Sequence, residues 1–315
     1  MIGDVNKSVI ADRDKKKKMN ELYVDVFERL NCMMNLSGEV VSQSIDGTIT
    51  MRSYLSGCPP VRMLLSENTL VGKDTPIPVV QDTEGRTLSA DDFIILDDIN
   101  FNGCMKLDKF DTQRLLCFNP PEGEFTAMNY RSTHSFFPPV SVQPVVEQVS
   151  EYKLDVVLKV TTNFSAELKC SELLVSFRTP RTTSSCKCEL PDEAKKQTTD
   201  YLETKRLVAW RIADAEGQHE FFLHVIITLT EPCNAWTVRS MGPIAWAMAG
   251  AVTSRLNFTI MNMSLSGMAV RDVKVDKLSN DPSVPEALAR GGGVMCRNQW
   301  IRYIVKSSSY VCRFS

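Results

Sequence analysis

The pattern that most constrains this chain is an alternation of residue types, broken at intervals by turn signals. In Leu22–Phe27 every second residue is Leu or Val. Turn signals follow at Ser37–Gly38, Asp46–Gly47 and Ser56–Gly57, a spacing typical of short consecutive strands. Side chains alternate between the two faces of a β-strand, and Gly beside Ser or Asp favours a turn. We therefore expect antiparallel strands and an all-β fold.

A second alternating stretch, Thr48–Tyr54, divides into an apolar and a polar face. Ile49 and Met51 fall on one face and Arg52 on the other. In the first stretch, Asp25 lies opposite the aliphatic residues. Asp25 and Arg52 are therefore predicted on the polar face of one sheet.

The strand pattern continues through residues 138–260. Leu207–Ile212 is predicted to pair with Phe221–Leu229 across a turn at Glu216–Gly217, as in a β-hairpin. Asp192–Thr204 has some helix-forming residues, but Pro191 and the paired threonines weaken that assignment. The β interpretation is therefore kept here.

Charge and cysteine content limit the classes of protein. The 315 residues are 43% hydrophobic and 23% charged, with a net charge of −2, which disfavours nucleic-acid binding through bulk charge. The ten cysteines have no regular spacing. Free thiols in a reducing cytosol fit this distribution better than a disulfide scaffold.

The N-terminal segment is expected to be a basic, polar linker covering residues 1–19. It contains the run Lys15–Lys18 and no apolar core, so it does not resemble a signal peptide. The run could act as a solvated tether or hold weakly to an anionic membrane. Met241–Val252, the longest apolar candidate, is too short for a transmembrane helix of ~20 residues.

Signals for catalysis or metal binding are poor. His134, His219 and His224 have no Cys, Asp or Glu partner at a zinc-ligand spacing. Cys186-Lys187-Cys188 is a single CxC pair, better explained by two incidental thiols than by a metal site. Gly291–Gly293 lacks the Lys-Ser/Thr of a phosphate-binding loop. We predict no enzyme activity, no metal and no cofactor.

The C-terminal strand offers a more specific feature. Trp300 and Arg302 project from one face, and Ile301 and Tyr303 from the other. Trp300 could be an outward side chain on a half-buried edge strand. A Trp beside an Arg can also stack another aromatic ring.

Five separated motifs, in one order from Asn20 to Phe314, carry a family resemblance. They are Asn20–Val26, Met51–Gly57, Pro120–Arg131, Ser266–Val270 and Trp300–Tyr303. The chain resembles the mu homology domain, the C-terminal cargo-binding domain of the medium (mu) subunits of clathrin-type adaptor complexes. Within that family, four short segments look most like the type-4 complex: Ser44–Ile49, Met128–Arg131, Thr199–Tyr201 and Ser309–Val311.

The resemblance implies an elongated fold of two antiparallel β-sandwich subdomains, one inserted into the other. Subdomain A, which binds the signal, would comprise residues 20–133 and 263–315. Subdomain B would be the inserted segment 134–262. That topology would bring the N-terminal Asp25 and the C-terminal Trp300 together.

The resemblance also assigns a pocket for the tyrosine of a Tyr-x-x-Φ sorting signal. Its residues are Tyr23, Asp25, Arg52, Trp300 and Arg302. The rings and the Arg302 guanidinium would stack on the phenol, and the Asp25 carboxylate would accept its hydroxyl proton. Family members often carry Phe in place of Tyr23 and Lys in place of Arg52. Asp25 with Arg52 can also be explained as a plain cross-strand ion pair.

The Φ residue of the signal would need an apolar socket. By resemblance its lining is Leu22, Val24, Val270, Val273 and Ile301. These residues can equally be ordinary core. The ligand is expected to bind extended and to add a strand at the edge formed by Gln299, Trp300 and Ile301.

These features imply a cytosolic adaptor at trans-Golgi and endosomal membranes and coated vesicles. Its expected partners are cargo tails, the large and small adaptor chains, and anionic membrane lipids through a peripheral contact. Family subunits begin with a longin-like domain absent from these 315 residues, so assembly is expected only of a full-length subunit. Two alternatives stay open: a scaffolding mu homology domain of a coatomer-like or endocytic accessory protein, and an extracellular β-sandwich.

Overall fold

The structure, a computed structural model, is nearly all β and divides into two compact units. It describes residues 21–35, 37–55, 57–72, 75–78, 89, 92–232, 253–276 and 298–313. Within these residues we find no helix whose length and apolar character would let it cross a lipid bilayer. The predicted all-β class is confirmed: the fold is that of a mu homology domain, with one β-sandwich subdomain inserted into the other.

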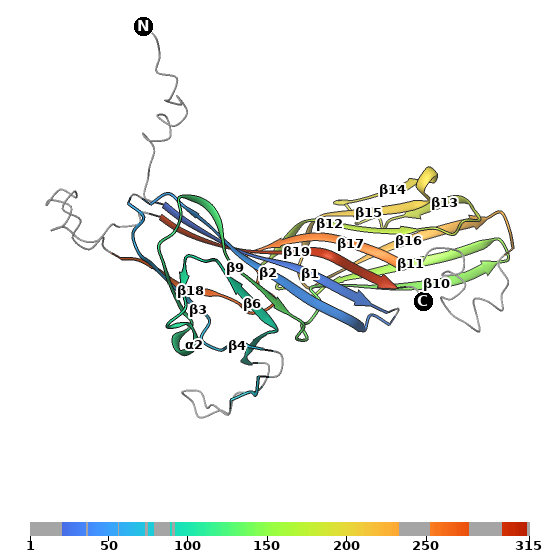
Figure 1. The fold of residues 1–315 in the computed structure, drawn as a ribbon. Coiled ribbons are helices and arrows are strands. Elements are labelled where there is room, and N and C mark those ends of the chain that lie inside the picture. The colour runs from blue at the N-terminus through green and yellow to red at the C-terminus, as the bar shows by residue number, and fades with distance from the viewer. Residues whose placement is uncertain are drawn as a thin grey trace, which may run out of the picture. The chain divides into compact units, whose positions relative to one another are not determined.

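The first unit is formed by the described parts of Met1–Phe27, Asp46–Ser132 and Ser264–Tyr303. One sheet has the order β19-β1-β2-β9-β6 and the other β18-β3-β8-β7, beside a parallel pair β4-β5 (Figure 1). The elements are β1 (Glu21–Met34), β2 (Val40–Ser53), β3 (Val61–Leu65), β4 (Thr69–Val71), β5 (Ile94–Leu96), β6 (Asp98–Phe101), β7 (Met105–Lys106), α2 (Phe110–Gln113), β8 (Leu115–Phe118), β9 (Gly123–Ser132), β18 (Val270–Val275) and β19 (Asn298–Arg313).

The second unit is formed by the described parts of Glu28–Ile45, Thr133–Met263 and Ile304–Ser315. Its sheets have the orders β14-β15-β12-β17-β19-β1-β2 and β10-β11-β16-β13. The additional elements are β10 (Val140–Ser150), β11 (Lys153–Thr162), β12 (Lys169–Arg178), β13 (Thr183–Glu189), β14 (Gln197–Leu202), η2 (Glu203–Lys205), β15 (Leu207–Glu216), β16 (His219–Leu229) and β17 (Thr253–Met261).

The two units do not coincide with the subdomains expected from the sequence, which stay a prediction. The described parts of residues 28–45 and 304–315, expected in subdomain A, group by their contacts with the inserted segment. The reason is that β1, β2 and β19 are long strands, and each contributes one half to each unit. The predicted linker, residues 1–19, lies outside the described residues.

The turn predicted at Asp46–Gly47 is wrong, because both residues lie inside β2. Gly47 is required there by a close approach. A Cβ atom on Gly47 would lie 2.0 Å from Cζ of Tyr130, whose side chain is buried. Glycine inside a strand can mark a close approach of another part of the chain instead of a turn.

The predicted hairpin between Leu207–Ile212 and Phe221–Leu229 is also wrong. The chain does turn after Glu216, but β15 pairs with β12 and β14, whereas β16 pairs with β11 and β13. The Thr162 hydroxyl holds this crossing, since it donates to the Glu216 carbonyl at 2.6 Å and accepts from the His219 amide at 3.0 Å. A turn signal shows that a chain reverses, and not which sheet it then joins. The segment 192–204 forms β14 and η2 rather than an α-helix.

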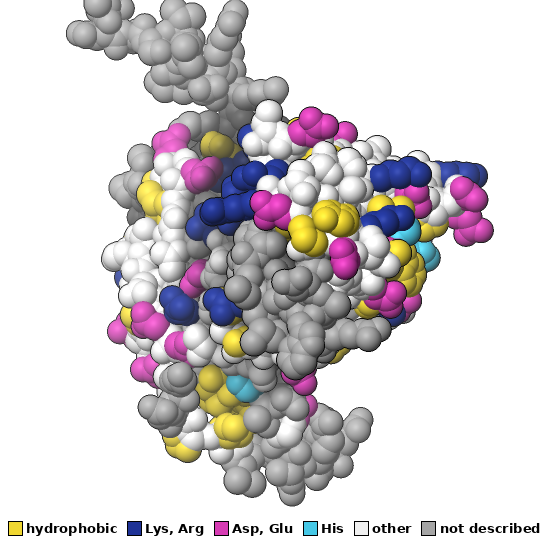
Figure 2. All heavy atoms as spheres, turned by 90° about the vertical axis from the view of Figure 1, so that its right-hand side faces the viewer, with side chains coloured by type: hydrophobic (Ala, Val, Ile, Leu, Met, Phe, Trp, Pro, Cys, Tyr) yellow, Lys and Arg dark blue, Asp and Glu magenta, His cyan; other side chains and the backbone are white. Residues whose placement is uncertain are grey.

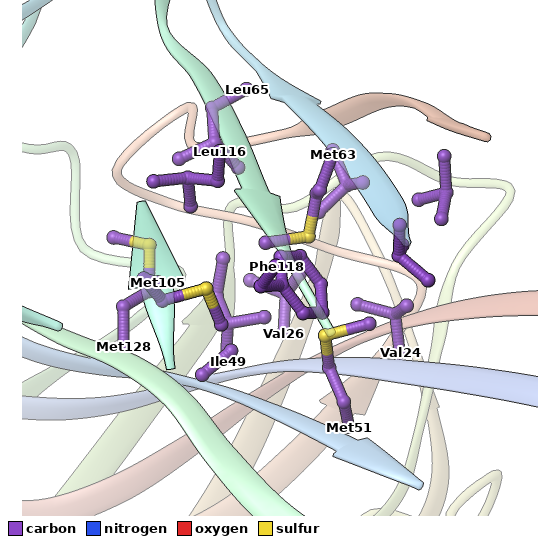
Figure 3. Close-up of a cluster of buried hydrophobic side chains, with 14 of the residues drawn as sticks. Val24, Val26, Ile49, Met51, Met63, Leu65, Met105, Leu116, Phe118 and Met128 are labelled. Atoms are coloured by element: carbon purple, nitrogen blue, oxygen red, sulfur yellow. The ribbon is translucent and has the colours of Figure 1, made fainter. Parts of the chain in front are cut away.

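The core of the first unit lies between its two sheets and follows the predicted alternation. Leu22, Val24 and Val26 of β1 are buried, while Tyr23 and Asp25 are only partly so. Figure 3 shows side chains from β1 and β2 directed toward those of β3 and β8. The labelled members of this cluster are Val24, Val26, Ile49, Met51, Met63, Leu65, Met105, Leu116, Phe118 and Met128.

Charge on the face shown in Figure 2 is mixed. Basic side chains (dark blue) and acidic side chains (magenta) are interspersed among the described residues. This distribution fits the net charge of −2.

Candidate functional site

The candidate site is centred on the carboxylate of Asp25, on the polar face of β1. Arg302 of β19 donates two hydrogen bonds to it: Nε to Oδ1 and Nη2 to Oδ2, both at 2.7 Å. The Asp25 side chain is 19% exposed and that of Arg302 47%. A bidentate pair of this kind fixes both side chains more firmly than a single contact would. Residues 277 positions apart in the chain are thus joined at one surface.

A second guanidinium approaches the same carboxylate from β2. Arg52 Nη2 lies 3.4 Å from Asp25 Oδ2, a long contact. The Arg52 guanidinium carbon also lies 5.1 Å from the centre of the Tyr23 ring, within the range of a cation–π interaction. Asp25 therefore lies between two cations, and the three groups together carry a net charge of +1.

Protonation at this surface follows from these contacts. The hydrogen bond to Asp25 raises the pKa of Arg302, so this guanidinium stays charged. An ionised carboxylate has about four acceptor positions, and the two guanidiniums occupy three of them. Among the described residues, this count leaves one acceptor position on Asp25 for a further donor.

Two residues extend the site beyond those predicted. The Tyr23 hydroxyl donates to Oε2 of Glu21 at 2.8 Å, and this hydrogen bond raises the pKa of Tyr23. The Tyr54 ring meets the Tyr23 ring edge-on, at 6.4 Å between centroids and 80° between planes. Glu21 could have been found from its position two residues before Tyr23 on the same strand face, whereas Tyr54 follows the end of β2, where alternation no longer applies.

Trp300 lies two residues before Arg302 on the same face of β19. Trp300 is 53% exposed, so a large part of its ring is accessible to a ligand. The structure thus places Trp300 on the polar face beside the joined group Tyr23, Asp25, Arg52 and Arg302. That surface can stack a flat ring and accept a hydrogen bond from it.

The five residues assigned to the Φ socket lie together, but mostly as packed core. Leu22 and Val24 are fully buried, Val270 and Val273 are 5% and 4% exposed, and Ile301 packs against the same cluster while half-buried. A β-bulge between Val270 and Asp272 puts Val270 and Val273 on one face although they are three residues apart. Of the five, Ile301 offers the most accessible surface.

The segment 298–303 of β19 has an open backbone edge in the described part of the chain. β17 pairs with β19 from Arg313 only as far as Ile304, which lies opposite Met261. Beyond that point β19 has β1 on one side and no paired strand on the other. The predicted edge residues Gln299, Trp300 and Ile301 all lie in this segment.

No metal or phosphate site was predicted from the sequence. Across the described residues, no three His, Cys, Asp or Glu side chains converge as metal ligands. His224 instead has its two ring nitrogens on two carboxylates, those of Asp155 and Glu189. Gly291–Gly293 lies outside the described residues.

Comparison with known proteins identifies the family. Residues 9–314 match the Adaptor complexes medium subunit family. The chain belongs to this family. Similar medium subunits include the AP-4 complex subunit mu of Arabidopsis thaliana, 30% identical over 314 residues, and the AP-2 complex subunit mu of Dictyostelium discoideum, 28% identical over 306. These alignments cover 98% and 94% of this chain, but it spans only 62% and 61% of the length of those subunits.

Solved medium-subunit-like domains share the fold. The yeast delta-COP-I mu-homology domain, in complex with a Dsl1 WxWxV peptide, matches with a TM-score of 0.59 at 12% identity, covering 93% of this chain and 98% of that domain. The Fcho1 mu homology domain of Danio rerio, with a bound Eps15 peptide, matches with a TM-score of 0.56 at 12% identity, covering 93% and 97%. The predicted resemblance to a mu subunit, with a type-4 subunit among its similar relatives, is confirmed.

Proposed function

We propose that this medium-subunit domain is a cargo receptor that binds Tyr-x-x-Φ signals in the cytosolic tails of membrane proteins. The observation that carries the proposal is the Asp25 carboxylate, held by Arg302 and approached by Arg52 on an accessible strand face. A buried ion pair of purely structural use would not need an exposed Trp300 beside it.

The tyrosine of the signal would lie against Trp300 and the Arg302 guanidinium. Its hydroxyl would donate to the remaining acceptor position on Asp25. Ring stacking and this hydrogen bond together distinguish a phenol from other side chains.

The peptide backbone would extend along the open edge of residues 298–303. Strand addition supplies main-chain hydrogen bonds, and alternate side chains then face the same surface. The Φ side chain would pack on Ile301, with Val270 and Val273 beneath it. Because these two valines are nearly buried, deep insertion of Φ would require them to shift.

The expected affinity is modest. Burying ~200 Å² of a tyrosine ring is worth about 5 kcal/mol, and an aliphatic Φ adds roughly 2 more. Ordering a flexible tail costs several kcal/mol. A Kd on the order of micromolar follows, so stable recruitment would depend on several contacts acting together at a membrane.

The decisive experiment is calorimetric titration of a Tyr-x-x-Φ peptide into the wild type, Asp25→Ala and Trp300→Ala. Each variant should bind at least tenfold more weakly, because one removes the acceptor and the other the stacking face. Both side chains lie on the polar surface, so the circular-dichroism spectrum should be unchanged.

Two variants serve as matched controls. Asp46→Ala removes a carboxylate of β2 that lies outside the proposed site. Its Oδ1 atom is 3.8 Å from Nη1 of Arg131. Phe137→Ala removes another exposed aromatic, 73% accessible. Both controls should bind like the wild type. Unchanged affinity in both Asp25→Ala and Trp300→Ala would refute the site and favour the scaffolding alternative.

We also propose where the domain acts and which partners it has, on the ground of its family membership. As a family member, the domain would act peripherally at trans-Golgi and endosomal membranes and on coated vesicles. Large and small adaptor subunits would be partners of the full-length subunit, and anionic lipids would add a weak contact. Fractionation of the full-length protein with and without its large subunits would test this assignment.

A further inference from the structure

The CxC motif of the sequence occupies an unusual position in the second unit. Cys186 and Cys188 lie on β13 directly opposite Ile227 and Val225 of β16. Directly paired residues share a face of a sheet, and both of these partners are fully buried. The two thiols therefore point from the same strand to the inner face of the four-stranded sheet.

The thiols are nevertheless only half-buried, because β13 is an edge strand. β16 pairs with one side of β13, and no strand in the described part of the unit pairs with the other side. β13 also contacts β14, the last strand of the other sheet. Partial exposure of both thiols at this edge is a requirement for their reaction with a small oxidant.

The two thiols interact with each other. The hydrogen bond that they share raises the pKa of Cys186 and lowers the pKa of Cys188. A thiol with a lowered pKa has a larger thiolate fraction, and the thiolate is the nucleophile in oxidation.

We propose that Cys186 and Cys188 form a reversible thiol–disulfide pair that is oxidised by hydroperoxides. The Cys188 thiolate, whose proton has passed to water, attacks a peroxide oxygen. The O–O bond breaks, a sulfenic acid forms, and the leaving alkoxide, or hydroxide from hydrogen peroxide, takes up a proton from water and departs as an alcohol or as water. Cys186 then attacks that sulfur, forms the S–S bond and displaces hydroxide, which leaves as water with the Cys186 proton. Two thiols lose two electrons in total, and one peroxide gains them.

Strand geometry makes the bond easy to reduce again. Two residues along an extended strand place Cα atoms about 6.6–6.8 Å apart, at the upper limit for a disulfide. β13 already has an irregular register between Thr183 and Ser185, so a further local bend is feasible at this edge. A strained disulfide has a higher reduction potential than an unstrained one and is the kind used for regulation.

Oxidation should also change the side-chain contacts on the opposite face of β13. There Glu189 contacts His224 Nδ1 at 3.3 Å and Lys187 Nζ at 2.6 Å. Bending the strand at Cys186 and Cys188 would draw Glu189 away from β16. The expected consequence is a looser β13 in the oxidised protein.

Trypsin provides a direct test, because it cleaves after Lys187, between the two cysteines. The purified domain is treated with hydrogen peroxide, blocked with iodoacetamide and digested without reductant. We expect residues 182–187 and 188–195 to appear as one linked species that dithiothreitol separates. Hydrogen exchange should be faster in β13 of the oxidised sample.

Variants make the test specific. Cys186→Ser and Cys188→Ser should each abolish the linked species, whereas Cys117→Ser, which removes another half-buried thiol, should leave it unchanged. The pair should react on the order of tenfold faster than Cys117. The proposal is overturned if Cys186 and Cys188 are alkylated separately after peroxide treatment, or are oxidised only to sulfinic acids.

Discussion

At the scale of single residues, the proposed binding specificity of the exposed face of β1 rests on Asp25. Arg302 and Arg52 fill three of its acceptor positions and keep it in place. In the proposed complex, the hydroxyl of the signal tyrosine would donate to the fourth. Selectivity at this surface would then depend on that one hydrogen bond.

Ligands that differ only at the tyrosine hydroxyl should bind very differently. Replacing Tyr by Phe keeps the stacking surface but leaves a partly buried acceptor unpaired, which costs about 1–3 kcal/mol. Binding should weaken on the order of tenfold or more. Matched Tyr and Phe peptides, compared by calorimetry, measure this difference, and equal affinities would mean that Asp25 does not face the phenol.

Phosphotyrosine should not bind. A phosphate brings a charge of about −1.5 to −2 next to Asp25 and needs more depth than a hydroxyl. Arg52 and Arg302 offset part of the repulsion, but both are already engaged by Asp25. Fluorescence anisotropy with a phosphorylated peptide should show no saturation up to a hundred times the Kd of the unmodified peptide. Saturable binding near that Kd would contradict the prediction.

At the scale of elements, the sequence indicated strands well and their partners poorly. The alternation in Leu22–Phe27 predicted which side chains of β1 are buried, because the period of two has a direct geometric cause. The length of β2 was missed, since Gly47 meets a ring on another strand, which local sequence does not reveal. The bulge that puts Val270 and Val273 on one face was not predicted either, because it is defined by the pairing of β18 with β3 and not by local sequence. The residues of the proposed Tyr pocket were assigned by resemblance, and the alternation of residue types placed them on the polar faces of their strands. The bidentate Arg302–Asp25 contact could not be predicted, because it depends on tertiary structure.

Substitution of Gly47 should therefore be costly. A methyl group at Gly47 would force the buried Tyr130 ring to move, and overpacking of this kind destabilises a core by about 1–3 kcal/mol. Gly47→Ala should lower the free energy of unfolding in urea by that amount. Gly103→Ala is the matched control, because a Cβ there meets no atom within 4 Å. An unchanged free energy of unfolding in Gly47→Ala would show that the Tyr130 ring can move without destabilising the protein.

At the scale of the whole molecule, the second unit contains ionisable groups that restrict its stability at high pH. Cys32 and Cys312 are both buried, and burial raises their pKa values to about 11 and about 12, from an ordinary value near 9.0. Tyr310 is buried beside them, and burial raises its pKa well above the usual range. In the unfolded chain these groups would ionise at lower pH than in the folded protein.

Stability should consequently fall in alkaline solution. The contribution of the two thiols is fully present below pH ~9 and decreases as the pH rises toward 11–12, because only the unfolded state releases their protons in that window. Urea midpoints at pH 8 and pH 10 should differ more for the wild type than for Cys32→Ala/Cys312→Ala. An equal difference in both proteins would exclude these thiols as the cause.

The passage of β1 through both units has a consequence for how this chain can change in length. Even-numbered positions are buried along the whole strand: Leu22, Val24 and Val26 in the first unit, and Leu30 and Cys32 in the second. Inserting or deleting one residue near Phe27 would turn one half of the strand inside out relative to the other. Substitutions can be absorbed one position at a time, whereas an odd change in length cannot. In this strand, the number of residues is therefore more tightly constrained than the identity of any one of them.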